Sequence, residues 1–157
     1  VEPITVPIKI LNALDGNIML FFTGISRTAE KVAKSYVEHI DEKSESLKPM
    51  YSMVDKAIEY LKNEDIDSFG SLLNETWQYK RKLSNLVSNE EIDSFYNKAL
   101  KAGALGGKIS GAGGGGFLTL YVPKEYQENV KKELSSLLHV PFSFEPTGSQ
   151  IIHYQRN

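Results

Sequence analysis

The residues with the clearest chemical potential in this sequence are glycines. Eight of the twelve glycines lie between positions 103 and 116, and five of them occupy the six positions 111–116. Consecutive glycines leave backbone N–H groups uncovered, permit positive φ angles and let a large or charged ligand approach the main chain. The run therefore indicates a loop that faces a ligand, with a plain hairpin loop or a point of close packing as the alternative.

The two standard phosphate-binding motifs do not fit this run. Gly111, Gly113 and Gly116 form a G-x-G-x-x-G pattern, but the dinucleotide fingerprint requires a helix after its glycines. Here the following residues, 117–122, have the composition of a strand. The Gly-Lys pair within the run is followed by isoleucine, where a Walker A loop needs serine or threonine.

A second candidate lies where a predicted strand meets a predicted helix. Ser26 and Arg27 stand at the start of the helical pattern. The free N–H groups and the dipole of a first helical turn attract anions, and an arginine adds a planar set of donors. The pair predicts a site for an anion. The alternative is that Ser26 only caps the helix and Arg27 is solvated or pairs with Glu30.

Trp77 and Lys80 form a third candidate, because they lie one helical turn apart and can face one groove. Such a pair could bind a ligand, with the ring stacking on it and the ammonium group holding an anionic group. The alternative is a core tryptophan beside a solvated lysine. The histidines at positions 39, 139 and 153 are too scattered to predict a metal site.

Length and composition describe one globular domain that spans residues 1–157. The 18 basic and 20 acidic side chains give a net charge of −2, so we expect no nucleic-acid partner. The absence of cysteine excludes disulfides and cysteine nucleophiles and fits a reducing compartment. The longest uninterrupted apolar stretch, 18–22, is far shorter than the ~20 residues of a membrane span, so we expect a soluble protein with no membrane partner. The chain begins with Val1 rather than methionine, which suggests a fragment.

Hydrophobic periodicity predicts the elements that must position these residues. Strands are predicted at 18–22, 117–122, 142–145 and 150–154, with a weaker one at 5–11. Helices are predicted at 26–40, 47–61, 65–87, 88–102 and 123–138, the first capped by Ser26 and the fourth by Ser88. This order predicts an α+β fold, a ferredoxin-like antiparallel sheet with helices on one face and extra helices inserted after the first crossover.

One segment resembles a motif of a known family. Residues 106–117, GGKISGAGGGGF, are similar to the third conserved motif of the GHMP kinases, which lies in the carboxy-terminal domain of those enzymes. Further similar segments follow in the family's order at 20–27, 69–73, 77–80, 83–84 and 92–96, so the resemblance covers nearly the whole chain. The form of the glycine run resembles the sugar-1-kinase branch. One departure is Asn74, where histidine is frequent in the family.

The resemblance implies the C-terminal, substrate-binding half of a kinase that uses ATP and Mg²⁺ to phosphorylate a sugar or sugar phosphate, with the anomeric hydroxyl of D-glycero-D-manno-heptose 7-phosphate as the expected acceptor. It also implies a partner, the N-terminal domain of the same kinase, which carries the nucleotide loop and the catalytic residues. The isolated chain would then hold no catalytic residue and be inactive. The alternative is a stand-alone ferredoxin-like module that binds a small molecule without catalysis.

Within that resemblance, the loop Gly111, Ala112, Gly113, Gly114 and Gly115 would form one wall of the substrate site. Ser26 and Arg27 would bind the phosphate of a sugar phosphate, and Trp77 and Lys80 would stack on the sugar and hold its phosphate. The substitution Gly113→Val is then expected to abolish sugar binding in the full-length enzyme while leaving the fold intact. The balanced charge and the absence of cysteine fit a cytoplasmic enzyme.

Overall fold

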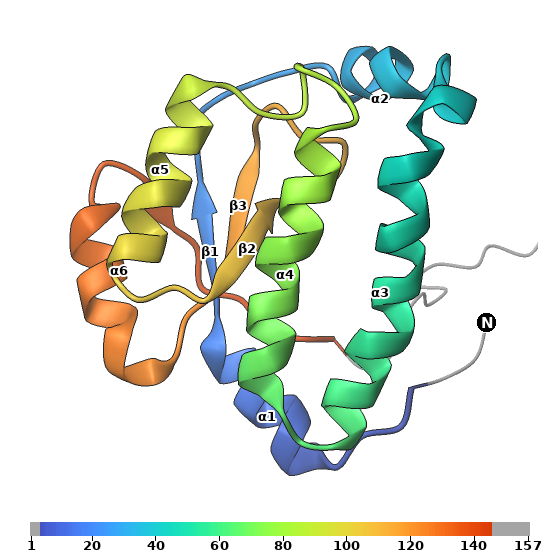
Figure 1. Ribbon diagram of the computed structural model, residues 1–157. Helices are drawn as coiled ribbons and strands as arrows, with labels where there is room; N and C mark the ends of the chain where they lie inside the picture. The colour runs from blue at the N-terminus through green and yellow to red at the C-terminus, as the bar shows by residue number, and fades with distance from the viewer. Residues whose placement is uncertain (1–3, 146–157) are drawn as a thin grey trace, which may run out of the picture.

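Four short strands and a set of helices make up the described part of the chain, residues 4–145 of a computed structural model (Figure 1). The helices are α1 (Ile8–Asn17), α2 (Ala29–Val37), α3 (Ser44–Lys62), α4 (Ile66–Arg81), α5 (Glu90–Lys101) and α6 (Gln127–Glu133). The strands are β1 (Ile18–Phe22), β2 (Gly106–Ile109), β3 (Phe117–Tyr121) and β4 (Leu138–His139). Two 3₁₀ turns, Ile40–Lys43 and Lys124–Tyr126, lead into α3 and α6.

The strands form one sheet in the order β2-β3-β1-β4, and every neighbouring pair is antiparallel. With α2 to α5 between β1 and β2, and α6 between β3 and β4, this is the ferredoxin-like β-α-β-β-α-β arrangement with extra helices in its first crossover. Figure 1 shows α4 and α5 over the same face of the sheet, with α3 running beside α4. The predicted α+β fold is confirmed.

The core contains the side chains that point to one face of β1 and β3. Met19 and Phe21 are buried and lie opposite Leu120 and Leu118, which are also buried. Because side chains in a strand alternate between faces, all four point to one side, where they share a cluster with Trp77 of α4. Burying each of these side chains contributes about 1.5–3 kcal/mol, which fixes the register of the two strands.

Helix α4 approaches the sheet so closely, at β2 and at β3, that glycine is required on both sides. A Cβ atom on Gly106 would lie 2.2 Å from the carbonyl oxygen of Gly70, and one on Gly70 would lie 2.3 Å from the ring of Tyr121. The Tyr121 hydroxyl donates to Asp67 Oδ1 at 2.8 Å and accepts from Asn17 Nδ2 at 3.0 Å. Burial, which is the main cause, and the bond to Asp67 raise the pKa of Tyr121, so it stays a neutral donor that ties α4 to β3.

The prediction of a strand at 5–11 is wrong, because this segment enters helix α1. Pro7 is the N-cap residue, and a fixed φ angle suits the start of a helix. Ile10, Leu14 and Asn17 are the buried residues of the helix, at spacings of four and three. The apolar pattern of this segment therefore has a helical period and not the period of two that a half-buried strand needs.

Several helix boundaries differ from the predicted ones. Helix α2 begins at Ala29, beyond Ser26, whose side chain does not cap it. Helix α4 ends at Arg81 instead of continuing to 87. Helix α5 is capped by Asn89, whose Oδ1 accepts from a backbone N–H of the first turn at 2.9 Å, and not by Ser88. Several polar residues near each boundary are suitable caps, and the path of the chain around the sheet selects one.

The sequence does not predict β2, because two of its four residues are glycine and only Ile109 is strongly apolar. The predicted helix at 123–138 consists of a 3₁₀ turn and the short helix α6, which ends at Glu133. Residues 142–145 do not form the predicted strand. The predicted strand at 150–154 lies outside the described residues.

Candidate functional site

The glycine loop, residues 110–116, joins β2 to β3 and is held by two other segments of the chain. The N–H of Gly114 donates to the carbonyl of Val87 at 2.7 Å, and the N–H of Gly116 donates to the carbonyl of Ile25 at 2.9 Å. The carbonyl of Gly116 accepts from the N–H of Thr23 at 2.9 Å and from its hydroxyl at 2.8 Å. The loop is therefore fixed between the β1–α2 connection and the α4–α5 connection.

Close packing explains three of the glycines. A Cβ atom added at Gly113 would lie 2.7 Å from the carbonyl oxygen of Val87. One added at Gly114 would lie 2.7 Å from a main-chain carbonyl oxygen, and one added at Gly115 would lie 2.4 Å from another. Such distances leave no room for any side chain. The expectation that Gly113→Val leaves the fold intact is therefore wrong, because the substitution forces backbone against backbone.

Gly111 differs from these three because a Cβ atom there would meet no atom within 4 Å, although its φ is +73°. Among the described residues, the N–H groups of Gly111, Ala112, Gly113 and Gly115 have no hydrogen-bond acceptor. A loop with positive φ angles and several unpaired N–H groups suits anionic or polyhydroxylated ligands. Close packing therefore explains the glycines of the buried part of the loop, and the open part around Gly111 is compatible with ligand binding.

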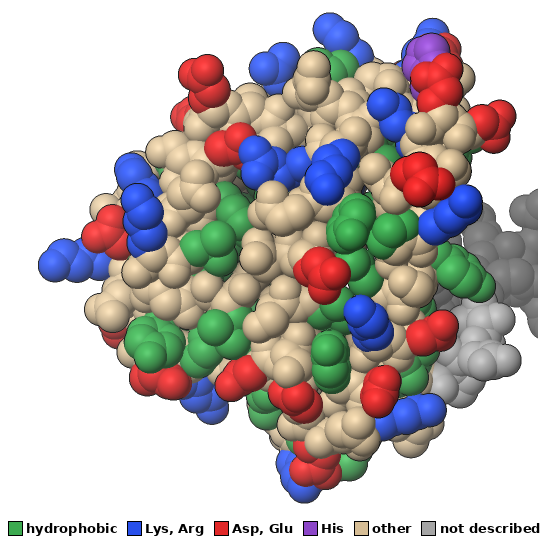
Figure 2. Space-filling view, viewed as in Figure 1, with side chains coloured by type: hydrophobic (Ala, Val, Ile, Leu, Met, Phe, Trp, Pro, Cys, Tyr) green, Lys and Arg blue, Asp and Glu red, His purple; other side chains and the backbone are tan. Residues whose placement is uncertain are grey.

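Lys80 lies in the last turn of α4 and reaches the glycine loop, where its ammonium group donates to the carbonyl of Gly111. Partial burial, and then the nearby charge of Lys108, lower the pKa of Lys80. Figure 2 shows Lys and Arg side chains gathered around the C-terminal end of α4. The open part of the loop therefore lies in a positively charged environment.

Trp77 is not beside Lys80 in a groove. Its side chain is 1% exposed and packs in the core, with its ring centroid 6.2 Å from that of Tyr96. A ring with no exposed face offers no platform for a sugar, so the structure does not support the interpretation of Trp77 as a stacking residue. The core alternative describes it.

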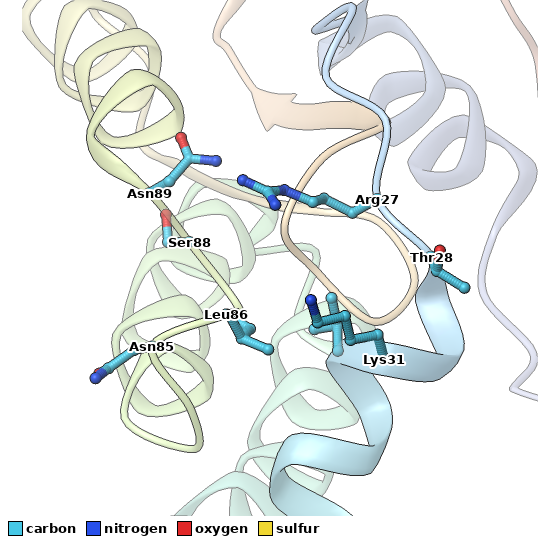
Figure 3. A pocket seen from close by; sticks show the side chains of 8 residues that line it. Arg27, Thr28, Lys31, Asn85, Leu86, Ser88 and Asn89 are labelled. Atoms are coloured by element: carbon cyan, nitrogen blue, oxygen red, sulfur yellow. The ribbon is translucent and has the colours of Figure 1, made fainter.

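Arg27 lines a small cavity next to the glycine loop, which we call the Arg27 pocket (Figure 3). The pocket has a volume of about 90 Å³ and lies between residues 27–32 and 85–89. A Cβ atom on Gly114 would lie 3.4 Å from Arg27 Cγ, so the pocket and the loop share a wall. Ser26 is exposed and does not line the pocket. In the described chain Arg27 forms no ion pair with Glu30.

The sequence does not single out the other polar residues of the Arg27 pocket. Lys31 lies in the first turn of α2, on the same side as Arg27, whereas Ser88 and Asn89 come from the α4–α5 connection. The spacing of Arg27 and Lys31, four residues apart at the start of a helix, is a signal for a shared face. Nothing in the sequence pairs that face with a segment almost sixty residues away.

Residues 4–145 contain no group of three or more His, Cys, Asp and Glu side chains that could hold a metal ion. Within the same range, no helix combines the length and the apolar character that crossing a membrane requires.

Comparison with known proteins identifies a family. The family described as GHMP kinases C terminal matches residues 57–140, which is more than half of the chain. The match includes α4, α5, the glycine loop, the central strand β3 and α6.

Individual relatives are consistent with this match. The chain is 33% identical over 138 residues to D-glycero-alpha-D-manno-heptose 7-phosphate kinase from Campylobacter jejuni, covering 85% of this chain and 40% of that protein. It is 36% identical over 87 residues to a galactokinase from Thermococcus kodakarensis, covering 55% of this chain and 24% of that protein. The structure of L. major mevalonate kinase in complex with R-mevalonate superposes with a TM-score of 0.66 and 26% identity, covering 76% of this chain and 37% of that one. The chain thus spans two fifths or less of the length of these relatives.

Proposed function

Because this chain belongs to the GHMP kinase family, we propose that it is the C-terminal part of an ATP-dependent kinase that phosphorylates a sugar or a sugar phosphate. The observation that carries the proposal is the glycine loop. The N–H groups of Gly114 and Gly116 anchor it to two connections, while its open part, beside Lys80, presents N–H groups that have no acceptor among the described residues. A fixed set of donors of this kind stabilises charge on a transferring phosphoryl group or orients the acceptor without having to be reorganised.

The acceptor that we propose is D-glycero-D-manno-heptose 7-phosphate, phosphorylated at its anomeric hydroxyl. The 33% identity to the C. jejuni heptose 7-phosphate kinase extends over 85% of this chain, much more than the 55% matched by the galactokinase. An acceptor that already carries a phosphate also suits the positive charge around the glycine loop. The alternative of a stand-alone binding module gains no support from relatives that are named as kinases.

The partner in this proposal is an N-terminal domain of the same kinase, because the relatives are more than twice as long as this chain. That domain would bind most of the ATP and supply the catalytic residues. Mg²⁺ would neutralise phosphate charge during transfer. We propose that its ligands come from the nucleotide and the other domain. We place the enzyme in the cytoplasm, where ATP is available.

The test is an assay of the full-length protein with ATP, Mg²⁺ and a panel of heptose 7-phosphate, galactose, fucose and mevalonate. ADP release is measured in a coupled assay, with a reaction that lacks an acceptor as the background. We expect heptose 7-phosphate to give the highest kcat/KM and a product with a second, anomeric phosphate in its ³¹P NMR spectrum. No ADP above background with any acceptor would contradict the kinase proposal, and turnover with mevalonate alone would contradict the sugar acceptor.

A pair of glycine variants tests the role of the loop in that assay. Gly111 and Gly24 have φ angles of +73° and +72°, and a Cβ atom at either position meets nothing within 4 Å. Gly111→Ala places a methyl group among the unpaired N–H groups and should lower kcat/KM, whereas Gly24→Ala carries the same backbone strain outside the loop and should not. Equal activities of the two variants would remove the loop from the substrate site.

A further inference from the structure

The Arg27 pocket has the charge of an anion site. Arg27 and Lys31 both line it, and none of the described residues that line it is acidic. Within residues 4–145, neither of the two cations forms an ion pair. The carboxylate of Asp93, close to the pocket, is already bound by Arg81 at 2.5 Å and by the hydroxyl of Ser88 at 2.6 Å. Two positive charges therefore face the pocket without compensation.

A neutral donor completes the arrangement. Asn89 Oδ1 is occupied, because it accepts from the N–H of Ile92 at 2.9 Å. This bond orients the side-chain amide so that its NH₂ group is left for another partner. Figure 3 shows the Asn89 amide nitrogen on the side of the Arg27 guanidinium, which extends across the pocket toward it. The donors thus come from two connections that the glycine loop holds together.

The size of the pocket decides which part of a ligand it can accept. A cavity of about 90 Å³ is well below the ~300 Å³ of the smallest sites that enclose a whole small molecule. It suits a compact end group, and a guanidinium, an ammonium and an amide together match the oxygens of a phosphate monoester. The rest of the ligand must lie outside the pocket, and the wall that it shares with Gly114 directs it toward the glycine loop.

We propose that the Arg27 pocket is a phosphate subsite, in which Arg27, Lys31 and Asn89 bind the phosphate that the sugar substrate already carries. The subsite fixes the non-reacting end of the substrate while the reacting hydroxyl lies near the glycine loop. It therefore determines the preference for a sugar phosphate over the free sugar. This inference rests on the proposed kinase function.

The kinetic test compares the full-length wild-type enzyme with Arg27→Gln and Lys31→Gln, using heptose 7-phosphate and the same heptose without phosphate. Lys34→Gln is the matched control, because Lys34 is also an exposed lysine of α2 but pairs with Glu38 at 3.6 Å and does not line the pocket. Arg27→Gln and Lys31→Gln should each raise KM for the phosphorylated sugar by roughly 10- to 100-fold, the range for loss of a charge-assisted hydrogen bond, with kcat nearly unchanged. KM for the free sugar should not change.

A second measurement does not depend on turnover. Binding of inorganic phosphate to the full-length protein is followed by ³¹P NMR or calorimetry in the wild type and the same three variants. Weak phosphate binding that is lost in Arg27→Gln and Lys31→Gln but kept in Lys34→Gln supports the subsite. If the same protein turns over no acceptor, that result contradicts only the proposed kinase function and leaves the subsite supported. Phosphate binding that is lost with no change in KM for the sugar phosphate would assign the pocket to free phosphate and overturn the proposal. An increase in KM for ATP instead, or kinetics and binding equal to wild type, would overturn it as well.

Discussion

Replacing Gly113 by alanine should destabilise the domain far more than the same replacement at Gly111, although both lie in one loop. Gly113 has a φ of +111°, and an added Cβ would lie 2.7 Å from the carbonyl oxygen of Val87. That carbonyl also accepts the hydrogen bond from the N–H of Gly114. The methyl group therefore adds backbone strain and separates the two segments that the bond joins.

The magnitude follows from these contacts. An alanine at a sparsely populated positive φ costs about 1–3 kcal/mol, and overpacking against main chain costs about 1–3 kcal/mol more. The unfolded chain loses conformational freedom when glycine is replaced, which returns about 0.4–1 kcal/mol. We therefore expect a loss of about 1–5.5 kcal/mol, centred near 3 kcal/mol. At Gly111 the only cost is that of holding an alanine in the left-handed conformation, about 1–2 kcal/mol, and the same 0.4–1 kcal/mol from the unfolded chain is subtracted from it. We therefore expect the Gly111 variant to lose about 0–1.6 kcal/mol.

Native-state hydrogen exchange is the suitable assay, because it reports the free energy of opening of individual segments in a protein of any length. Peptides from β1 and β3 should exchange much faster in Gly113→Ala than in wild type, and only slightly faster in Gly111→Ala. Equal losses in the two variants would refute the reasoning that contact with Val87 requires glycine at 113. A loss in neither would show that the connection around Val87 moves aside at little cost.

Two further predictions concern residues around the loop and the sheet. Lys80→Met keeps the stem of the side chain but removes the donor to Gly111, so the amides of the glycine loop should exchange roughly 2- to 10-fold faster; Lys82→Met, whose ammonium lies over the Tyr79 ring, should leave them unchanged. Burial, and then the charge of Lys131, lower the pKa of His139 below the unfolded value of 6.5, so protonation favours the unfolded state. The stability that depends on neutral His139 should therefore be complete above pH 6.5 and decline as the pH falls toward the folded pKa. The free energy of unfolding, measured at pH 7.5 and at pH 5.5, should show this decline in the wild type and not in His139→Gln.

The strands and helices that the sequence predicts correctly are those whose own residues carry the signal. Residues 18–22 and 117–121 are apolar runs bounded by turn residues, and both are central strands. Strand β2 has no such signal, because Gly106 is required by the approach of α4 and Gly107 by the close approach of β3, with which the strand pairs. Close approach between distant segments selects glycine for a reason that a local pattern does not contain.

The same limit applies to the candidate site. The glycine run marks the loop from sequence alone, but it does not distinguish Gly113, which touches Val87, from Gly111, which faces open space. Trp77 and Lys80 share a helix face by spacing, yet the ring packs in the core and the ammonium group reaches the loop. Lys31 has no motif of its own, and only the fold places it in a pocket.

The hydrogen bonds of the glycine loop explain how a glycine-rich segment can act as a fixed wall. Five glycines in regular structure would cost about 2.5–5 kcal/mol in backbone entropy relative to alanine. The four hydrogen bonds to Thr23, Ile25 and Val87 return about 2–6 kcal/mol, which is a similar amount. The loop is therefore ordered by its neighbours and not by its own composition. Because Ile25 and Val87 belong to the two connections that also form the Arg27 pocket, a ligand that joins the walls of that pocket should also stabilise the loop.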